Sequence, residues 1–426
     1  MTADAPGTDP PPTTAGQVEL RALTRDRSFM LYLVGQATSG GGSALASVAL
    51  VFAVLSISRS AGSVGFVLLA SRLPAIALAL AGGVVADRSS RKWIAVCADG
   101  ARTMLQLATG VLLLSGHASV LALAGLQLAS GGASAMFGPA AGSLLAGVAP
   151  GGEIRRATSL LEMTTAVTQT GGLALAGILV ASAGPGASLL IDGATFAVST
   201  VTLALISAPV SPRPPAERAL TRQPLAELRE GWRAVRSRHW LLVTSVRETL
   251  INVLVLSPLF VLGPVIARDR LGGASAWSAI ALGYVAGSFA AAHLTYHWAP
   301  RRPMRAVAML SPALVPLLAL LGLAAPLWLI VPAAFLAGAE TTIHNVVSTA
   351  ALQANIPDDT LGRVSAITAI GSTILVPVGM GLAGVLAQAV GTPAVMFGAA
   401  ALVTLSAAVC VPLRAIRTPL ELDRRA

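Results

Sequence analysis

The sequence has few charged and few aromatic side chains. Only 11% of its 426 residues are charged and 4% are aromatic, whereas 54% are hydrophobic. A soluble globular protein carries about 25% charged residues, because it must cover its surface with polar groups. The composition therefore excludes an ordinary soluble domain and indicates a protein whose surroundings are lipid.

The chain also lacks the residues of common metal, cofactor and catalytic sites. Its two cysteines, Cys97 and Cys410, fall inside apolar runs, which excludes a disulfide framework and a cysteine metal site. There is no Gly-x-x-x-x-Gly-Lys-Ser/Thr phosphate loop, as a primary pump would need, and no Gly-x-Ser-x-Gly or His-Glu-x-x-His motif. We expect a protein that is not an enzyme and binds neither a metal nor a cofactor.

Lysine is almost absent: the sequence contains one lysine, Lys92, and 28 arginines, and its net charge is +10. Such an excess can indicate a nucleic-acid partner, but here the basic residues lie in short gaps between apolar runs, so no nucleic acid is expected. Residues 1–28 begin with a polar, proline-rich segment without the basic start and apolar stretch of a signal peptide. They predict a disordered cytoplasmic tail.

Long apolar runs dominate the rest of the chain. A bilayer core of about 30 Å requires about 20 apolar residues in a helix, and lipid leaves backbone groups no partners except one another. The runs predict an all-α membrane protein with twelve transmembrane helices, near 29–57, 63–85, 93–115, 119–146, 157–182, 187–208, 241–266, 275–298, 304–323, 326–350, 362–389 and 391–412.

The distribution of basic residues predicts the orientation of these spans. With the N-terminus inside, 23 of the 29 basic residues are cytoplasmic, three lie outside and three lie within spans. This positive-inside bias predicts a multi-pass protein of the plasma membrane with both termini in the cytoplasm. The predicted parts are 1–28 (tail), 29–208 (six-helix half), 209–240 (cytoplasmic linker), 241–413 (second six-helix half) and 414–426 (tail).

The two halves carry a weak internal repeat at an offset of 207 residues. Residues 175–179 (Leu-Ala-Gly-Ile-Leu) align with 382–386 (Leu-Ala-Gly-Val-Leu), and the glycines at 172 and 184 align with those at 379 and 391. Chance similarity between helices rich in Ala, Gly and Leu is the alternative to duplication. Duplicated transporters bind substrate near the midplane between their repeats.

The loop between the second and third runs carries a motif. Residues 83–92 read Gly-Val-Val-Ala-Asp-Arg-Ser-Ser-Arg-Lys, which resembles the Gly-x-Leu-Ala-Asp-Arg-x-Gly-Arg-Arg loop of the major facilitator superfamily. Val85 and Ser90 depart from that pattern. Residues 71–74, 137–140 and 353–363 resemble the bacterial branch that includes enterobactin-type siderophore exporters. The resemblance implies two pseudo-symmetric six-helix halves, a bacterial origin and a monomer in the lipid bilayer.

The resemblance also implies a gating latch in this loop. Asp87 is expected to dock at the start of the eleventh span in the opposite half, because a helix N-terminus favours a carboxylate. Arg88, Arg91 and Lys92 would pair with acidic groups or lipid phosphates. The alternative is that these residues only anchor the protein at the cytoplasmic surface.

Charges inside spans are costly and mark candidate functional sites. Asp99 and Arg102, three residues apart on one helix face, predict an intramembrane ion pair. Asp192 is expected to be solvated or to cap a helix, and Arg247 is expected to extend to the membrane surface.

Glu340 lies near the middle of the tenth span, with His344 one turn later. A carboxyl removed from water favours its neutral form, and histidine titrates near neutral pH. Both residues are therefore candidates for proton coupling or for binding substrate. The alternative is a carboxyl hydrogen-bonded to its neighbours for structure only.

Further polar residues are candidates for a central cavity: Gln36, Gln127, Asn252 and Asn345. The glycines at 40–42 and the Ser-Pro pair at 257–258 predict bends or local unwinding. Two features common in proton antiporters of the superfamily are missing, namely an arginine in the fourth span and a Gly-Pro pair in the fifth.

The sequence therefore predicts a secondary exporter of a small organic molecule, such as a drug, siderophore or secondary metabolite, driven by proton antiport with alternating access. A nutrient importer or facilitator on the same fold is the second hypothesis, and a non-transporting membrane scaffold or sensor is the third.

Overall fold

The structure is a computed structural model that describes residues 25–81, 91–149, 154–207, 224–297, 300–369 and 374–417. All regular elements among these residues are helices. Nine described helices are long and apolar enough to cross a membrane. Residues 1–24 and 418–426 of the predicted tails and residues 83–90 of the motif loop lie outside the described residues. Residues 414–417 of the predicted C-terminal tail form the short helix α18 (Arg414–Arg417).

Each predicted span coincides with a helix or with a run of helices. The first six correspond to α2 (Arg27–Ile57), α3 (Ala61–Ala81), α4 (Arg91–Leu114), α5 (Val120–Val148), α6 (Ile154–Ser182) and α7 (Gly184–Leu205). The seventh span is a run of four elements: α9 (His239–Ile251), η3 (Asn252–Leu256), α10 (Ser257–Ile266) and η4 (Ala267–Leu271). The eighth is α11 (Ala274–His297), and the ninth consists of α12 (Pro303–Leu310), η5 (Ser311–Leu314) and α13 (Val315–Gly322). The tenth is α14 (Leu327–Asn355), the eleventh contains α15 (Asp358–Ala369) and α16 (Val376–Val390), and the twelfth is α17 (Thr392–Cys410).

The connections end the helices where the sequence offers suitable turn residues. Gly184 and Gly391 have φ of +82° and +86°, a left-handed conformation that glycine adopts at little cost. These two residues are equivalent in the 207-residue repeat. Between the ninth and tenth spans Ala324, which is not a glycine, takes a positive φ of 49°.

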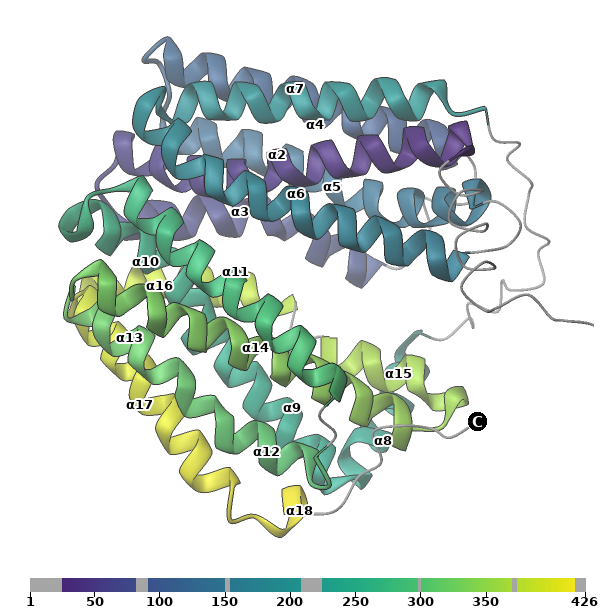
Figure 1. The fold of residues 1–426 in the computed structure, drawn as a ribbon, viewed down its shortest axis with the longest axis vertical. Coiled ribbons are helices and arrows are strands. Elements are labelled where there is room, and N and C mark those ends of the chain that lie inside the picture. Colours follow the sequence, from purple (N-terminus) through teal and green to yellow (C-terminus); the bar gives the residue numbers. More distant parts are fainter. Residues whose placement is uncertain are drawn as a thin grey trace, which may run out of the picture.

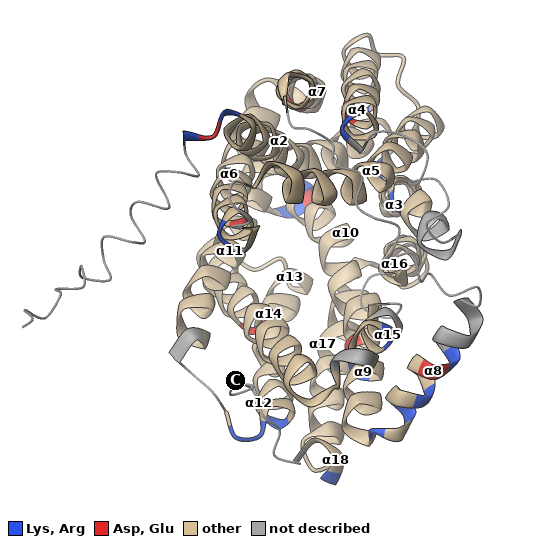
Figure 2. Cartoon of the chain, turned by 90° about the vertical axis from the view of Figure 1, so that its right-hand side faces the viewer, with Lys and Arg blue, Asp and Glu red and all other residues tan. Residues whose placement is uncertain are grey.

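The helices form two groups, α2–α7 and α9–α17, which meet at one end of the molecule and diverge toward the other (Figure 1). We call the first the closed end and the second the α8 end, after the linker helix α8 (Pro224–Ser237) that lies there. Lys and Arg residues gather on α8 and in the connections of this end (Figure 2). Helix α8 docks on α15, where Arg363 Nη1 lies 3.1 Å from Glu230 Oε2.

The local unwinding predicted as one possibility at the glycines 40–42 is absent, because α2 is continuous through them. These glycines serve close packing instead: a Cβ on Gly42 would collide with the side chains of Asp192 and Thr195 on α7. A glycine of α2 also meets Gly172 of α6, and Gly379 of α16 meets the backbone of Val253 in the same way. The repeat-equivalent glycines thus make corresponding helix contacts in the two halves.

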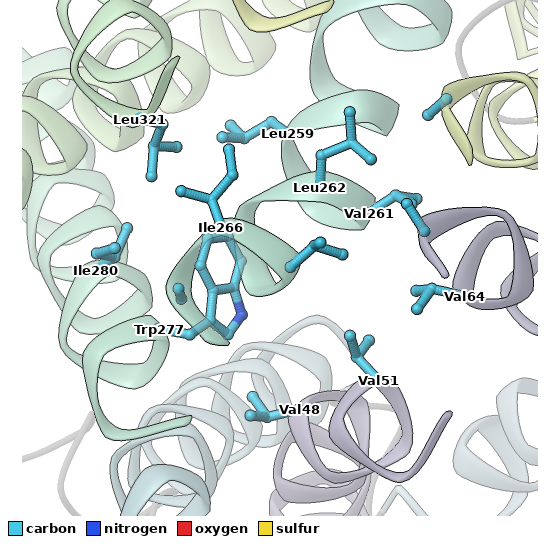
Figure 3. Close-up of a cluster of buried hydrophobic side chains, with 14 of the residues drawn as sticks. Val48, Val51, Val64, Leu259, Val261, Leu262, Ile266, Trp277, Ile280 and Leu321 are labelled. Carbon is cyan, nitrogen blue, oxygen red and sulfur yellow. The ribbon is translucent and has the colours of Figure 1, made fainter. Parts of the chain in front are cut away.

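Side chains of both groups form the apolar closed end. Val48, Val51 and Val64 from α2 and α3 face Leu259, Val261, Leu262 and Ile266 of α10, together with residues of α11 and α13 (Figure 3). Two polar contacts close the rim. Gln388 Nε2 donates to Ser60 Oγ at 2.6 Å, and Arg268 Nη1 donates to the Leu55 carbonyl at 3.1 Å.

Gly384 provides a test of this end. A Cβ added there would lie 2.6 Å from Gly62 Cα and 2.7 Å from the Ala61 carbonyl oxygen, so Gly384→Val is expected to push α16 away from α3. Overpacking of this kind costs ~1–3 kcal/mol. A cysteine placed at Ser60 should then react faster with a water-soluble maleimide. Gly398→Val is the matched control, because a Cβ there meets nothing within 4 Å; equal labelling in both variants would contradict the close packing.

Candidate functional site

Helices α9 and α14 border a polar cavity of about 180 Å³ inside the C-terminal half. Helix α9 exposes Thr244, Ser245, Arg247 and Glu248 to it, and α14 exposes His344, Asn345, Ser348 and Thr349. Every residue of its wall belongs to residues 240–416. We call it the C-half cavity. Because it lies beside α12, α15 and α18, it is near the α8 end of the molecule.

Arg247 is an arginine in the wall of this cavity. It is only 6% exposed, and its Nε is buried with no hydrogen-bond partner in the part of the chain that the structure describes. The guanidinium interacts electrostatically with Glu248, Glu340 and His344. The expectation that Arg247 reaches the membrane surface is therefore wrong. Its guanidinium stays inside because the nearby carboxyls replace part of the solvation that it loses.

Glu340 lies one helical turn from His344 on α14 and is 5% exposed. Its Oε2 accepts a long hydrogen bond of 3.5 Å from Thr341 Oγ1, which also donates to the Ala337 carbonyl at 2.9 Å. Glu340 also interacts electrostatically with Tyr284 of α11 and with Arg247 of α9. Its single weak hydrogen bond leaves the carboxyl capacity to gain or lose a proton.

The helix that carries Arg247 widens just beyond it. Residues Asn252–Leu256 form a π-helical turn, and Pro258 follows without an N–H for a helical hydrogen bond. Ser257 Oγ donates to the Asn252 carbonyl at 2.8 Å and to the Val376 carbonyl at 3.1 Å. The π-helical turn ends one residue before the Ser-Pro pair at 257–258, where bends or local unwinding were predicted, and the pair itself begins the α-helix α10. Turns of this type often occur at functional sites.

The four candidate cavity residues have different surroundings. Asn345 lines the C-half cavity, and Asn252 donates its Nδ2 to the Glu248 carbonyl at 3.0 Å. Gln36 of α2 is partly exposed, and its Nε2 is buried without a hydrogen-bond partner among the described residues. Gln127 is 7% exposed and donates to Gln106 Oε1 at 3.5 Å. Gln127 therefore lies in the packed interior of the N-terminal half.

That interior contains the ion pair of α4. Arg102 Nη1 lies 2.8 Å from Asp99 Oδ1, and Ser199 Oγ donates to Asp99 Oδ2 at 2.5 Å. The Arg102 guanidinium also lies over two aromatic rings, those of Phe137 and Phe196, at 5.1 and 4.0 Å from their centroids. Charge, hydrogen bonding and cation–π contact together hold α4, α5 and α7 in one arrangement.

Asp192 extends the same network and is not solvated, contrary to the expectation. It is 1% exposed, and Gln106 Nε2 donates to its Oδ2 at 2.6 Å. Asp192 also interacts electrostatically with Arg102. In the N-terminal half, Asp99, Arg102 and Asp192 thus belong to one buried network. In the C-terminal half, Arg247 and Glu248 line a cavity instead.

The predicted gating latch is described only in part. Asp87 and Arg88 lie outside the described residues, and the structure describes Arg91 only as the first residue of α4. Lys92 Nζ donates to the carbonyls of Ala204 and Ile206, at 2.7 Å each. These carbonyls belong to the end of α7, where a cation complements the helix dipole. In this conformation Lys92 therefore joins two helices of the same half.

Comparison with known proteins identifies the family. A family model described as a transmembrane secretion effector matches residues 22–422. The chain belongs to the transmembrane secretion effector family. No curated protein sequence matches this chain.

Solved structures show that this chain has the fold of major facilitator superfamily transporters. It superposes on a bacterial homologue of the iron transporter ferroportin with a TM-score of 0.72 at 15% identity, covering 90% of this chain and 97% of that one. The nucleoside transporter NupG gives 0.68 at 13% identity, with 90% and 97% covered. A D-xylose-proton symporter gives 0.66 at 12% identity, with 94% and 98% covered. By family and fold, the protein is a membrane transporter.

Proposed function

We propose that this transporter exports a small organic molecule across the bacterial plasma membrane in exchange for protons, and that Glu340 carries the coupled proton. The observation that supports this proposal best is the position of Glu340. It is a buried carboxyl with one weak hydrogen bond, next to Arg247 and behind a polar cavity that lies near the α8 end. A drug, a secondary metabolite or a siderophore is the expected cargo.

The proposed orientation places the α8 end in the cytoplasm, because the basic residues gather there. The contacts at the closed end would then seal the outer side, and this conformation would face inward. In the opposite state the loop that contains Asp87, Arg88 and Arg91 would hold the α8 end closed. The family description, which refers to secretion, favours export over import.

Proton release from Glu340 would follow the polar face of the C-half cavity. Protonation of Glu340 removes its attraction for Arg247, and deprotonation restores it. His344 and Glu248 are the other titratable groups near the guanidinium on α14 and α9. The π-helical turn after Arg247 would pass the change in this contact to α10, which forms much of the closed end.

The test of this function uses everted membrane vesicles, in which respiration acidifies the interior. A panel of lipophilic dyes and antibiotics is added outside, and accumulation is compared with vesicles that lack the protein. We expect at least one compound to accumulate and to leave when a protonophore dissipates the gradient. An importer would instead deplete the vesicle interior, and a scaffold or sensor would move no compound.

Arg247→Gln is expected to change the pH dependence of this transport. Loss of the cation removes the attraction that favours the ionised Glu340, so proton release needs a lower proton concentration. The pH of half-maximal transport should rise by about one unit, the lower end of the effect that a nearby opposite charge has on a carboxyl. Arg247→Lys keeps the charge and is the matched control. An unchanged pH profile in Arg247→Gln would separate Arg247 from the coupling.

A further inference from the structure

A second cavity lies where the two halves meet, beside the apolar closed end. Its volume is about 270 Å³. The N-terminal half contributes Ser47 and Val48 of α2 and Leu173 of α6, and the C-terminal half contributes residues of α10, α11 and α13. We call it the interhalf cavity. A molecule bound in it would touch both halves and would sense their relative movement.

The walls of the interhalf cavity are almost entirely apolar and partly aromatic. Phe260, Trp277 and Tyr284 line it, and the rings of Phe260 and Tyr284 meet edge to face at a centroid distance of 6.1 Å. Phe260 is 42% exposed. Apolar surface of this kind gains free energy when a hydrophobic group displaces water from it. A polyhydroxylated molecule would instead lose hydrogen bonds there.

The cavity is connected to the Glu340 site through Tyr284. Trp277 lies at the closed end, and Tyr284 follows seven residues later, about 10 Å further along α11. The Tyr284 backbone packs against Gly338 of α14, two residues before Glu340, and the Tyr284 side chain interacts electrostatically with the Glu340 carboxyl. An apolar group in the cavity would thus end next to Tyr284, which lies close to the coupling carboxyl.

We propose that the interhalf cavity binds the apolar body of the transported substrate, and that the cargo is a lipophilic organic compound with a ring-sized hydrophobic portion. This inference rests on the proposed export function and narrows its substrate class. A hydrophilic cargo such as a sugar or a nucleoside does not fit these walls. The other source of the same chemistry is the acyl chain of a membrane lipid, which the experiment below distinguishes.

The test measures binding without a proton gradient. The full-length protein in lipid nanodiscs is irradiated with benzophenone, a lipophilic aromatic probe that inserts into nearby C–H bonds, and adducts are mapped by peptide mass spectrometry. We expect adducts on Phe260, Tyr284 and Val285 that unlabelled naphthalene suppresses. Adducts on lipid-facing positions such as Leu121 and Trp328, which are 74% and 71% exposed, should resist this competition.

Two substitutions fill the cavity from opposite walls. Ala281→Phe on α11 and Ser47→Phe on α2 should each lower cavity labelling about tenfold, a change equal to ~1.4 kcal/mol of binding free energy. Ala290→Phe places the same side chain at an exposed position of the same helix and is the matched control. Unchanged adducts at Leu121 and Trp328 report that each variant is folded.

Three results would overturn the inference. The first is cavity labelling that naphthalene does not suppress. The second is cavity labelling that persists in both Ala281→Phe and Ser47→Phe. The third is labelling of the same residues by a phospholipid that carries a diazirine in its acyl chain. The last would assign the cavity to a lipid. Proton-driven export of a compound in everted vesicles would still support the proposed function in each case, so the two failures are distinguishable.

Discussion

Glu340→Gln is expected to reduce gradient-driven export to the level of vesicles without the protein. Glutamine has nearly the same shape as glutamate and keeps a hydrogen bond to Thr341, but it cannot take up or release a proton. Glu340 is only 5% exposed, so bulk water is not expected to take over proton uptake and release at this position. Exchange of labelled for unlabelled substrate across the membrane should persist, because it requires movement of the halves but no net proton transfer.

Export under a gradient and substrate exchange without one are both measured in vesicles containing the variant. Glu162→Gln is the control, since Glu162 is an exposed carboxylate of α6 that interacts with no part of the site. Loss of both gradient-driven export and substrate exchange would indicate a misassembled protein. In that case the activity of Arg247→Lys shows whether the site tolerates a conservative substitution. A Glu340→Gln protein that exports at the normal rate would exclude Glu340 as the proton carrier.

Cross-linking the closed end is expected to stop transport completely and reversibly. Gln388 Nε2 and Ser60 Oγ lie 2.6 Å apart across the two halves. In a background with Cys97→Ser and Cys410→Ser, the pair Ser60→Cys and Gln388→Cys can be joined by a short bis-methanethiosulfonate reagent. Alternating access requires this end to open, so the joined protein should neither export nor exchange substrate. A reducing agent should restore both activities.

The controls for this experiment are the two single-cysteine proteins treated with the same reagent. They carry the modification but no link between the halves, and they should keep most of their activity. Full transport by a protein whose cross-link is verified by mass spectrometry would show that the closed end does not separate during transport. The structure would then describe a static interface rather than a gate.

Much of the architecture could be predicted from the sequence. Lipid requires that backbone groups bond within each helix, so the apolar runs predicted the positions of the helical segments. The glycines at 184 and 391, which fall between apolar runs and align in the repeat, both take a positive φ. The spacing of Asp99 and Arg102 predicted a contact within one helix, where geometry depends on local sequence alone.

Contacts between helices could not be predicted in this way. Membrane helices such as α2 and α14 are apolar around most of their circumference, so the sequence does not show which face meets which neighbour. Arg247 and Glu340 are 93 positions apart in the sequence, and only the tertiary arrangement of α9 and α14 around the C-half cavity lets their charges interact. Packing also placed Gln127 in the hydrogen-bonded interior of the N-terminal half. The glycines 40–42 allow close contact between α2 and its neighbouring helices, which the sequence did not show.

The sequence by itself determined that this is a helical membrane protein, because solvation by lipid acts on local composition. Tertiary structure decided where its charges meet and where cavities remain. It closed the N-terminal charges into a network, exposed Arg247 to the C-half cavity and left an apolar space between the halves. Those outcomes depend on shape complementarity between distant segments, which no single stretch of sequence contains.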